Sequence, residues 1–251
     1  MAILIGHASQ DENKKAKGGK AGDQSKKEVF TRNYYLKGNS WDFVIRFESE
    51  EMAEKAAIAC EQACKNDKIG YDQSQRNTLL AEARKVKFDL SKIKTACECD
   101  CSSLMCVCAI AAGVDEKYLF ISNNLRVTGN MKDAFKKIPG VKILTDSKYL
   151  TSDKYLKRGD IIVKANNHTI MALENGEKAE EFKPYLIKVT ADELNIRKGP
   201  GVKYEIVGVI KDNGVYTIVE EYMNGSTKWG LLKSGAANRN KWISLAYTKK
   251  K

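Results

Sequence analysis

The sequence predicts an α+β domain over residues 1–183, followed by a small all-β domain over residues 186–251. Helix-like and strand-like segments alternate irregularly in the first part. After Pro184 the chain holds only short apolar runs separated by Gly, Asn, Asp and Pro, as in small β domains. A length of 251 residues is sufficient for two domains of this size.

Apolar periodicity and helix-end signals define the elements of the first domain. Ser49, followed by Glu50 and Glu51, indicates a helix start, because acids in a first turn match the helix dipole. Asn175-Gly176 favours a hairpin turn. The expected elements are a strand at 2–6, a loop at 8–28, a strand at 41–47, helices at 49–65, 74–85, 101–112 and 130–138, a strand at 141–144, and strands over 159–183.

The second domain shows turn signals at short, regular intervals. Its expected strands are 186–189, 194–197, 205–210, 215–221, 229–232 and 242–244. Such spacing predicts a small barrel. Tyr204, Tyr216, Tyr222, Trp229 and Trp242 could form a binding surface or belong to the core.

Charge and hydropathy narrow the partners. The net charge of +11 favours an anionic partner. The sequence has no zinc-finger spacing, aromatic RNA-binding motif or helix-turn-helix pattern, so we expect no nucleic acid and consider the bacterial wall, another polyanion. No run approaches the roughly 18–20 apolar residues of a membrane span, and the start lacks the features of a signal peptide. We therefore expect a monomer made in the cytoplasm without membrane insertion.

Seven cysteines and two histidines make a nucleophile–base pair easy to search for. An odd cysteine number without a signal peptide argues against a disulfide framework, and Cys60 and Cys64 fit a helix core. Five cysteines crowd residues 97–108, whereas structural zinc sites take ligands from two separated knuckles. We therefore expect neither a metal nor a cofactor.

Cys101 opens the expected helix 101–112, with Asp100 before it as a cap. A helix N-terminus lowers the pKa of a thiol, and the Cys101 amide could hold an oxyanion. His168 follows a strand-like run and could serve as the base. From these residues alone, a buried helix cysteine is an equally good interpretation.

Three blocks resemble the NlpC-type peptidoglycan peptidases, which have a papain-like fold. They lie within residues 95–182 and are Asp100-Cys101-Ser102-Ser103-Leu104, Gly159-Asp160-Ile161-Ile162-Val163, and His168-Thr169-Ile170-Met171-Ala172-Leu173-Glu174-Asn175-Gly176. The resemblance implies that Cys101 is the nucleophile and His168 the general base. It also implies an oxyanion or substrate site near Tyr71, Asp100 and Ser102.

The resemblance places the third catalytic residue twelve positions after the histidine, at Glu180. With an ideal turn at Asn175-Gly176, however, Glu180 would point away from His168, and Glu181 is then the alternative. The resemblance assigns no role to His7, and we expect a structural or surface histidine there.

The segment Leu194-Asn195-Ile196-Arg197-Lys198-Gly199-Pro200 resembles the opening of bacterial SH3-like domains, which attach enzymes to cell walls. Together the two resemblances imply an endolysin that cleaves a stem-peptide amide of Gram-positive peptidoglycan after release from the host cytoplasm. Alternatives are a CHAP-type muramoyl-L-alanine amidase, a chromosomal autolysin, an inactive wall-binding or phage structural protein, and a cytosolic zinc or nucleic-acid protein.

Overall fold

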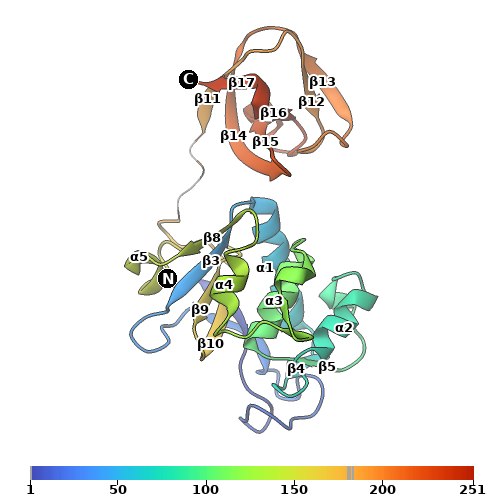
Figure 1. Ribbon diagram of the computed structural model, residues 1–251, viewed down its shortest axis with the longest axis vertical. Helices are drawn as coiled ribbons and strands as arrows, with labels where there is room; N and C mark the ends of the chain where they lie inside the picture. Colours follow the sequence, from blue (N-terminus) through green and yellow to red (C-terminus); the bar gives the residue numbers. More distant parts are fainter. Residues whose placement is uncertain (1, 180–181, 183) are drawn as a thin grey trace. The chain divides into compact units, whose positions relative to one another are not determined.

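The computed structural model describes residues 2–179, 182 and 184–251, which form two compact units, residues 1–179 and 180–251 (Figure 1). The first unit is a mixed α+β domain, and the second is all antiparallel β. None of the described helices is long and apolar enough to cross a membrane.

The first unit is built on a six-stranded antiparallel sheet with the order β2-β1-β10-β9-β3-β8. Its strands are β1 (Leu4–Ala8), β2 (Val29–Asn33), β3 (Phe43–Phe47), β8 (Val141–Leu144), β9 (Ile161–Lys164) and β10 (His168–Ala172). Successive residues of a strand face opposite sides, so Ile162 and Val163 enter two separate apolar clusters.

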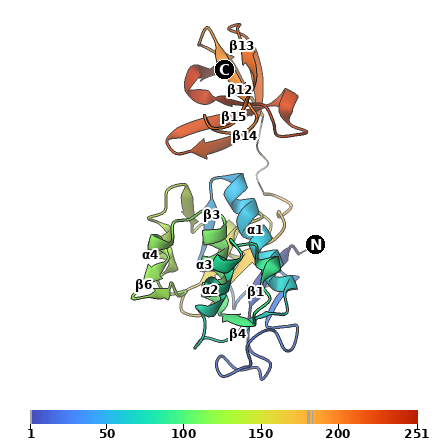
Figure 2. The same cartoon turned by 90° about the vertical axis from the view of Figure 1, so that its right-hand side faces the viewer.

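Helices α1 (Glu50–Lys65) and α3 (Cys101–Ala111) cover one face of this sheet, and Figure 2 shows them side by side. The Ser49 side chain caps α1 as expected, by accepting a bond from the Met52 amide. Every residue of α3 from Cys101 to Ile110 is buried, which explains why its sequence is apolar on all sides after the two serines of its first turn.

Smaller elements surround this core. A parallel pair, β4 (Ile69–Tyr71) and β5 (Cys97–Cys99), precedes α3. The others are α2 (Thr78–Lys85), β6 (Phe120–Ile121), β7 (Asn124–Leu125), α4 (Met131–Phe135), α5 (Ser147–Leu150), and 3₁₀ turns at Leu90–Lys92 and Glu116–Tyr118. The sequence predicted α2 and α4 with longer bounds and missed β2, β4 and β5, because these three strands are short and lack clear alternation.

The expected hairpin at Asn175-Gly176 is wrong. The turn instead joins β9 to β10 through residues 165–167, where Asn166 adopts φ +57°. Residues 173–179 form no strand, and the second neighbour of β10 is the N-terminal strand β1. The chain therefore completes its sheet beside His168 with a segment that lies more than 160 residues earlier.

The Gly159-Asp160 motif has a structural reason. Gly159 adopts φ +88°, and a Cβ there would lie 2.4 Å from the backbone oxygen of Ala53 in α1. Asp160 is buried and binds Arg46 of β3 through two bonds of 2.8 and 2.6 Å. The motif thus holds β9 against both α1 and β3.

The second unit is a seven-stranded antiparallel sheet with the order β13-β12-β16-β15-β14-β11-β17. Its strands are β11 (Tyr185–Val189), β12 (Leu194–Arg197), β13 (Ile206–Ile210), β14 (Val215–Asn224), β15 (Thr227–Leu232), β16 (Trp242–Ser244) and β17 (Thr248–Lys250), with 3₁₀ turns at Lys233–Gly235 and Leu245–Tyr247. In the described residues β13 and β17 remain unpaired edges, so the expected barrel is not closed by strand pairing. Trp229 and Trp242 are buried together with Leu231 and belong to the core.

We expect Gly159→Ala to destabilise the protein more than Gly113→Ala. Both glycines have positive φ, which costs an alanine about 1–3 kcal/mol, but only Gly159 would also push a Cβ into backbone. Thermal unfolding of the two variants should therefore differ by a further 1–3 kcal/mol or so. Equal losses of stability would contradict the close contact with Ala53.

Candidate active site

Cys101 is the first residue of α3, and a capping box holds it there. The Asp100 carboxylate accepts a bond of 2.7 Å from the Ser103 amide, and the Ser103 hydroxyl accepts a bond of 2.8 Å from the Asp100 amide. The prediction that Asp100 caps this helix is confirmed. Because α3 packs on β10, the cap sets the thiol beside the start of that strand.

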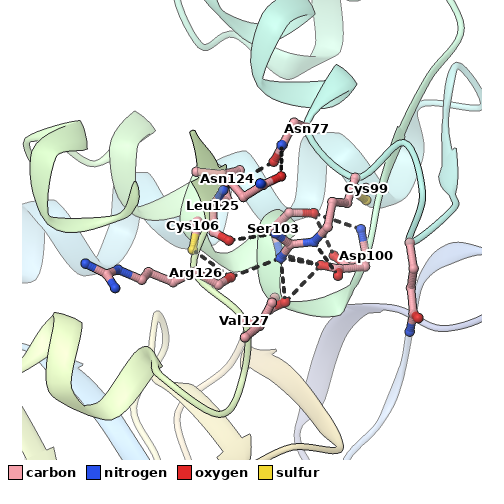
Figure 3. A network of polar contacts seen from close by, with 12 residues as sticks. Asn77, Cys99, Asp100, Ser103, Cys106, Asn124, Leu125, Arg126 and Val127 are labelled. Atoms are coloured by element: carbon pink, nitrogen blue, oxygen red, sulfur yellow. Dashed lines mark hydrogen bonds and ion pairs between the residues drawn. The ribbon is translucent and has the colours of Figure 1, made fainter. Parts of the chain in front are cut away.

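Arg76, which was not identified from the sequence, stabilises the Asp100 cap through hydrogen bonds. Its guanidinium donates to both Asp100 oxygens, at 2.6 and 3.1 Å, and to the Ser102 hydroxyl at 2.8 Å. It also donates to the Leu125 and Arg126 carbonyls at 2.6 and 3.0 Å. Figure 3 shows the segment from Leu125 to Val127 beside Asp100 and Ser103. A buried arginine gives no sequence signal distinct from a surface one.

This network assigns Asp100 and Ser102 to the cap. Burial alone would raise the pKa of Asp100, but Arg76 and the Ser103 amide hold that pKa below its usual value. The Ser102 side chain is buried and donates to Asp100 at 2.9 Å. Both residues therefore hold the helix start in place, and the oxyanion or substrate role that the resemblance implies for them stays a prediction.

The thiol of Cys101 is neutral at physiological pH. Burial raises its pKa to about 12, and the Asp100 carboxylate raises it further, whereas the amides of Thr169 and Ser102 lower it. The helix N-terminus therefore acts in the expected direction but is outweighed by burial. Contact with the Thr169 amide also places the sulfur next to the residue that follows His168.

His168 contacts the other histidine of the chain. It begins β10, and the pairing of β1 with β10 brings His7 against it, with His7 Nδ1 3.1 Å from His168 Nε2. Both rings are buried. The expectation of a structural or surface role for His7 did not include this contact, because nothing local in the sequence shows that β1 lies beside β10.

Both imidazoles are neutral near pH 7. Burial and the charge of Lys37 lower the pKa of His168 to about 4. Burial lowers the pKa of His7 to about 3, with further contributions from His168, Arg32 and Lys37. A neutral His7 can accept the Nε2 proton of His168, which leaves Nδ1 of His168 to act as a base.

The thiol and the imidazole are not hydrogen-bonded to each other in the described structure. The two residues are close along β10, because Cys101 lies against the amide of Thr169, which directly follows His168. Catalytic hydrogen bonds are often long in an empty site and shorten when substrate binds. Proton transfer from sulfur to Nδ1 therefore requires the two side chains to approach each other.

Two tyrosines lie near the thiol. Burial raises the pKa of Tyr71, and the charges of Cys101 and Asp100 raise it further, so the hydroxyl is close to both. Its oxygen accepts a bond of 3.1 Å from the Gln73 amide, which leaves its own hydrogen free for a third group. Tyr35 was not identified from the sequence; burial raises its pKa to about 12, and Cys101 contributes.

The remaining predicted residues fall outside this geometry. Glu180 and Glu181 lie outside the described residues. Asn175 accepts a bond of 2.8 Å from the Arg158 amide. The seven cysteines are free thiols, and no three of the described His, Cys, Asp and Glu side chains are grouped to hold a metal ion.

Buried acidic side chains form hydrogen bonds that hold the segment between β1 and β2 in place. Glu28 accepts the amides of Gln24 and Tyr71, at 2.8 and 3.1 Å. Glu98, on β5, accepts the Gly22 amide at 2.7 Å, while its other oxygen is buried without a partner. The segment predicted as a surface loop is therefore anchored at several buried acids beside Tyr71.

Residues 5–179 match the family model described as an endolysin-like domain, and the chain belongs to this family. Membership indicates a role in cell-wall lysis, and the matched range contains Cys101, His168 and His7. No curated protein and no solved structure matches the chain at a significant level.

Glu98→Gln should become progressively more stable than the wild type as the pH rises from 5 to 8.5. Burial and the charges of Glu28, Asp72 and Glu12 raise the pKa of Glu98 to about 8. Between its usual pKa near 4.5 and 8, the unfolded chain releases this proton while the folded protein retains it, so the stability of the wild type falls.

Thermal unfolding at several pH values measures this effect, with the exposed Glu177→Gln as control. A difference between Glu98→Gln and wild type that stays constant over this range would contradict a protonated Glu98.

Proposed function

We propose that this protein is a peptidoglycan hydrolase of the endolysin type, in which Cys101 attacks an amide of the wall stem peptide and His168 is the general base. The observation that carries the proposal is the contact of 3.1 Å between His168 and His7, beside the capped thiol. This histidine pair supplies the third member that a Cys–His site requires for orientation.

The first half-reaction forms a thioester. The Cys101 thiol proton passes to His168 Nδ1 while sulfur attacks the carbonyl carbon, and the carbonyl electron pair moves to oxygen. The Cys101 amide, at the open start of α3, and the free hydrogen of Tyr71 are the donors for this oxyanion. His168 then gives its proton to the leaving nitrogen as the C–N bond breaks.

The second half-reaction restores the enzyme. His168 takes a proton from water, the hydroxide oxygen attacks the thioester carbon, and the C–S bond breaks as sulfur regains the proton. Each half-reaction passes through an imidazolium at His168. In both half-reactions, the Nε2–H of His168 donates a hydrogen bond to His7, and this bond orients the His168 ring.

We further infer that the first unit is an NlpC-type, papain-like domain in which β1 carries the third residue. The bond cleaved is an endopeptide bond or, in the CHAP-type alternative, the muramoyl-L-alanine amide. The sequence of β12 supports an SH3-like wall-binding role for the second unit. Tethering to an insoluble substrate raises the effective concentration of a weak catalytic domain. We infer that the protein reaches the cell wall when it is released during phage lysis.

Cys101→Ala should abolish turbidity loss of purified Gram-positive walls, because no other group takes the place of the sulfur. Cys106→Ala, on the same helix, is the control, and should lower stability while retaining lysis by folded protein. Lytic activity of the Cys101→Ala protein equal to that of wild type would rule out the nucleophile. Mass spectrometry of the released fragments identifies the bond.

His7→Leu should lower kcat about 100-fold or more with little change in KM, because the imidazolium loses its acceptor. His7→Asn, which offers an oxygen acceptor, should recover part of the loss.

In the wild type, kcat/KM should fall only below about pH 5, since the pKa of His168 lies at about 4 and the base must be neutral.

These variants distinguish a positioning role from a structural one. If His7→Leu loses thermal stability but its folded fraction keeps the wild-type kcat and pH profile, His7 is structural only.

A further inference from the structure

A cation and a tyrosine extend from the histidine pair along β2. Phe30 pairs with His7 in the β1–β2 register, and their rings lie 4.6 Å apart. Two residues further along β2, the Arg32 guanidinium lies 4.5 Å from the centre of the Tyr35 ring. That ring is in turn 6.2 Å from His7. Stacking on an aromatic face fixes the plane of a guanidinium and leaves its edge available for an anion.

Lys37 is a second cation that acts on the histidine pair. It is half-buried in the segment after β2, and its charge acts on both His7 and His168. Within the described residues, no carboxylate lies within ion-pair distance of Arg32 or Lys37. Most of the other cations near this domain's core, such as Arg46, Arg76 and Arg158, do have carboxylate partners.

The charge of Lys37 opposes the proposed reaction at His168, and Arg32 and Lys37 both disfavour a charged His7. The mechanism places a positive charge on His168 in each half-reaction, and like charges nearby disfavour that state. Asp100 is the acid that favours a charged His168, but its carboxylate is already bound by Arg76. A substrate anion bound to these cations would reduce this penalty.

We propose that Arg32, stacked on Tyr35, and Lys37 form a subsite for a free carboxylate of the substrate, adjacent to the scissile amide. This proposal rests on the proposed function and names its substrate class: stem peptides in which a carboxylate near the cleaved bond is free rather than amidated. Arg32 presents two parallel donors for a carboxylate, and Lys37 supplies a second charge. The carboxylate then contributes both to binding and to the charged state of His168.

The test uses soluble stem-peptide fragments freed of phosphate polymers, with their carboxylates either free or converted to carboxamides. Wild-type kcat/KM should fall about 10- to 100-fold on amidation, the loss typical of a hydrogen-bonded charge. Arg32→Gln/Lys37→Met should show a similar loss on the free-carboxylate fragments and no further loss on the amidated ones. Arg32→Lys/Lys37→Arg keeps both charges but loses the parallel donors of Arg32, and should retain more activity than Arg32→Gln/Lys37→Met.

The controls separate the subsite from the reaction itself. Lys137→Met removes an exposed lysine after α4 and should behave as wild type on both fragments. Equal wild-type rates on free and amidated fragments would overturn the subsite while leaving the hydrolase intact. No cleavage of either fragment or of whole walls by wild type would overturn the proposed function. The wild-type comparison holds even if the double variant fails to fold.

Discussion

The pairing of β1 with β10 is the contact on which the candidate site depends. It brings His7 within 3.1 Å of His168 and carries β2, with Phe30 and Arg32, to the same edge of the sheet. The segment between β1 and β2 then packs against β4 through Glu28 and the Tyr71 amide. Loss of this single strand pairing would separate His168 from His7, from Arg32 and from the segment that contacts Tyr71.

Burial decides the protonation state of the resting site. It raises the pKa of the Cys101 thiol and lowers the pKa of both histidines, so the pair stays neutral, rather than forming a thiolate–imidazolium pair in advance. The Asp100 carboxylate beside the thiol is held by Arg76 and serves the helix cap. In the proposed mechanism, charge therefore develops only during the reaction, when substrate groups are present to stabilise it.

Local signals in the sequence predicted much of this structure. Asp100 before an apolar helix, Ser49 before an acidic first turn and the change in pattern after Pro184 each depend on neighbouring residues, and the structure has each of these features. The predictions that needed long-range information were incomplete or wrong. The neighbour of β10 is β1 and not a following strand, and the turn lies at residues 165–167, with Asn166 at positive φ, instead of at Asn175-Gly176.

The prediction of the candidate site was also limited by the lack of long-range information. Cys101 and His168 could be identified because cysteine opens a capped helix and histidines are scarce, whereas His7, Arg76 and Tyr35 could not. Their roles arise from pairs of residues 161, 24 and 66 positions apart in the chain, brought together by tertiary packing. Periodicity and capping contain no information about such contacts.

The central claim is that Cys101 forms a covalent bond to the substrate. Acid quenching during turnover of stem-peptide fragments, followed by mass spectrometry of the protein, measures this directly. The account predicts a transient acyl adduct on the peptide that contains Cys101, lost as product accumulates. Turnover without any adduct on Cys101, or with an adduct on another residue, would contradict it.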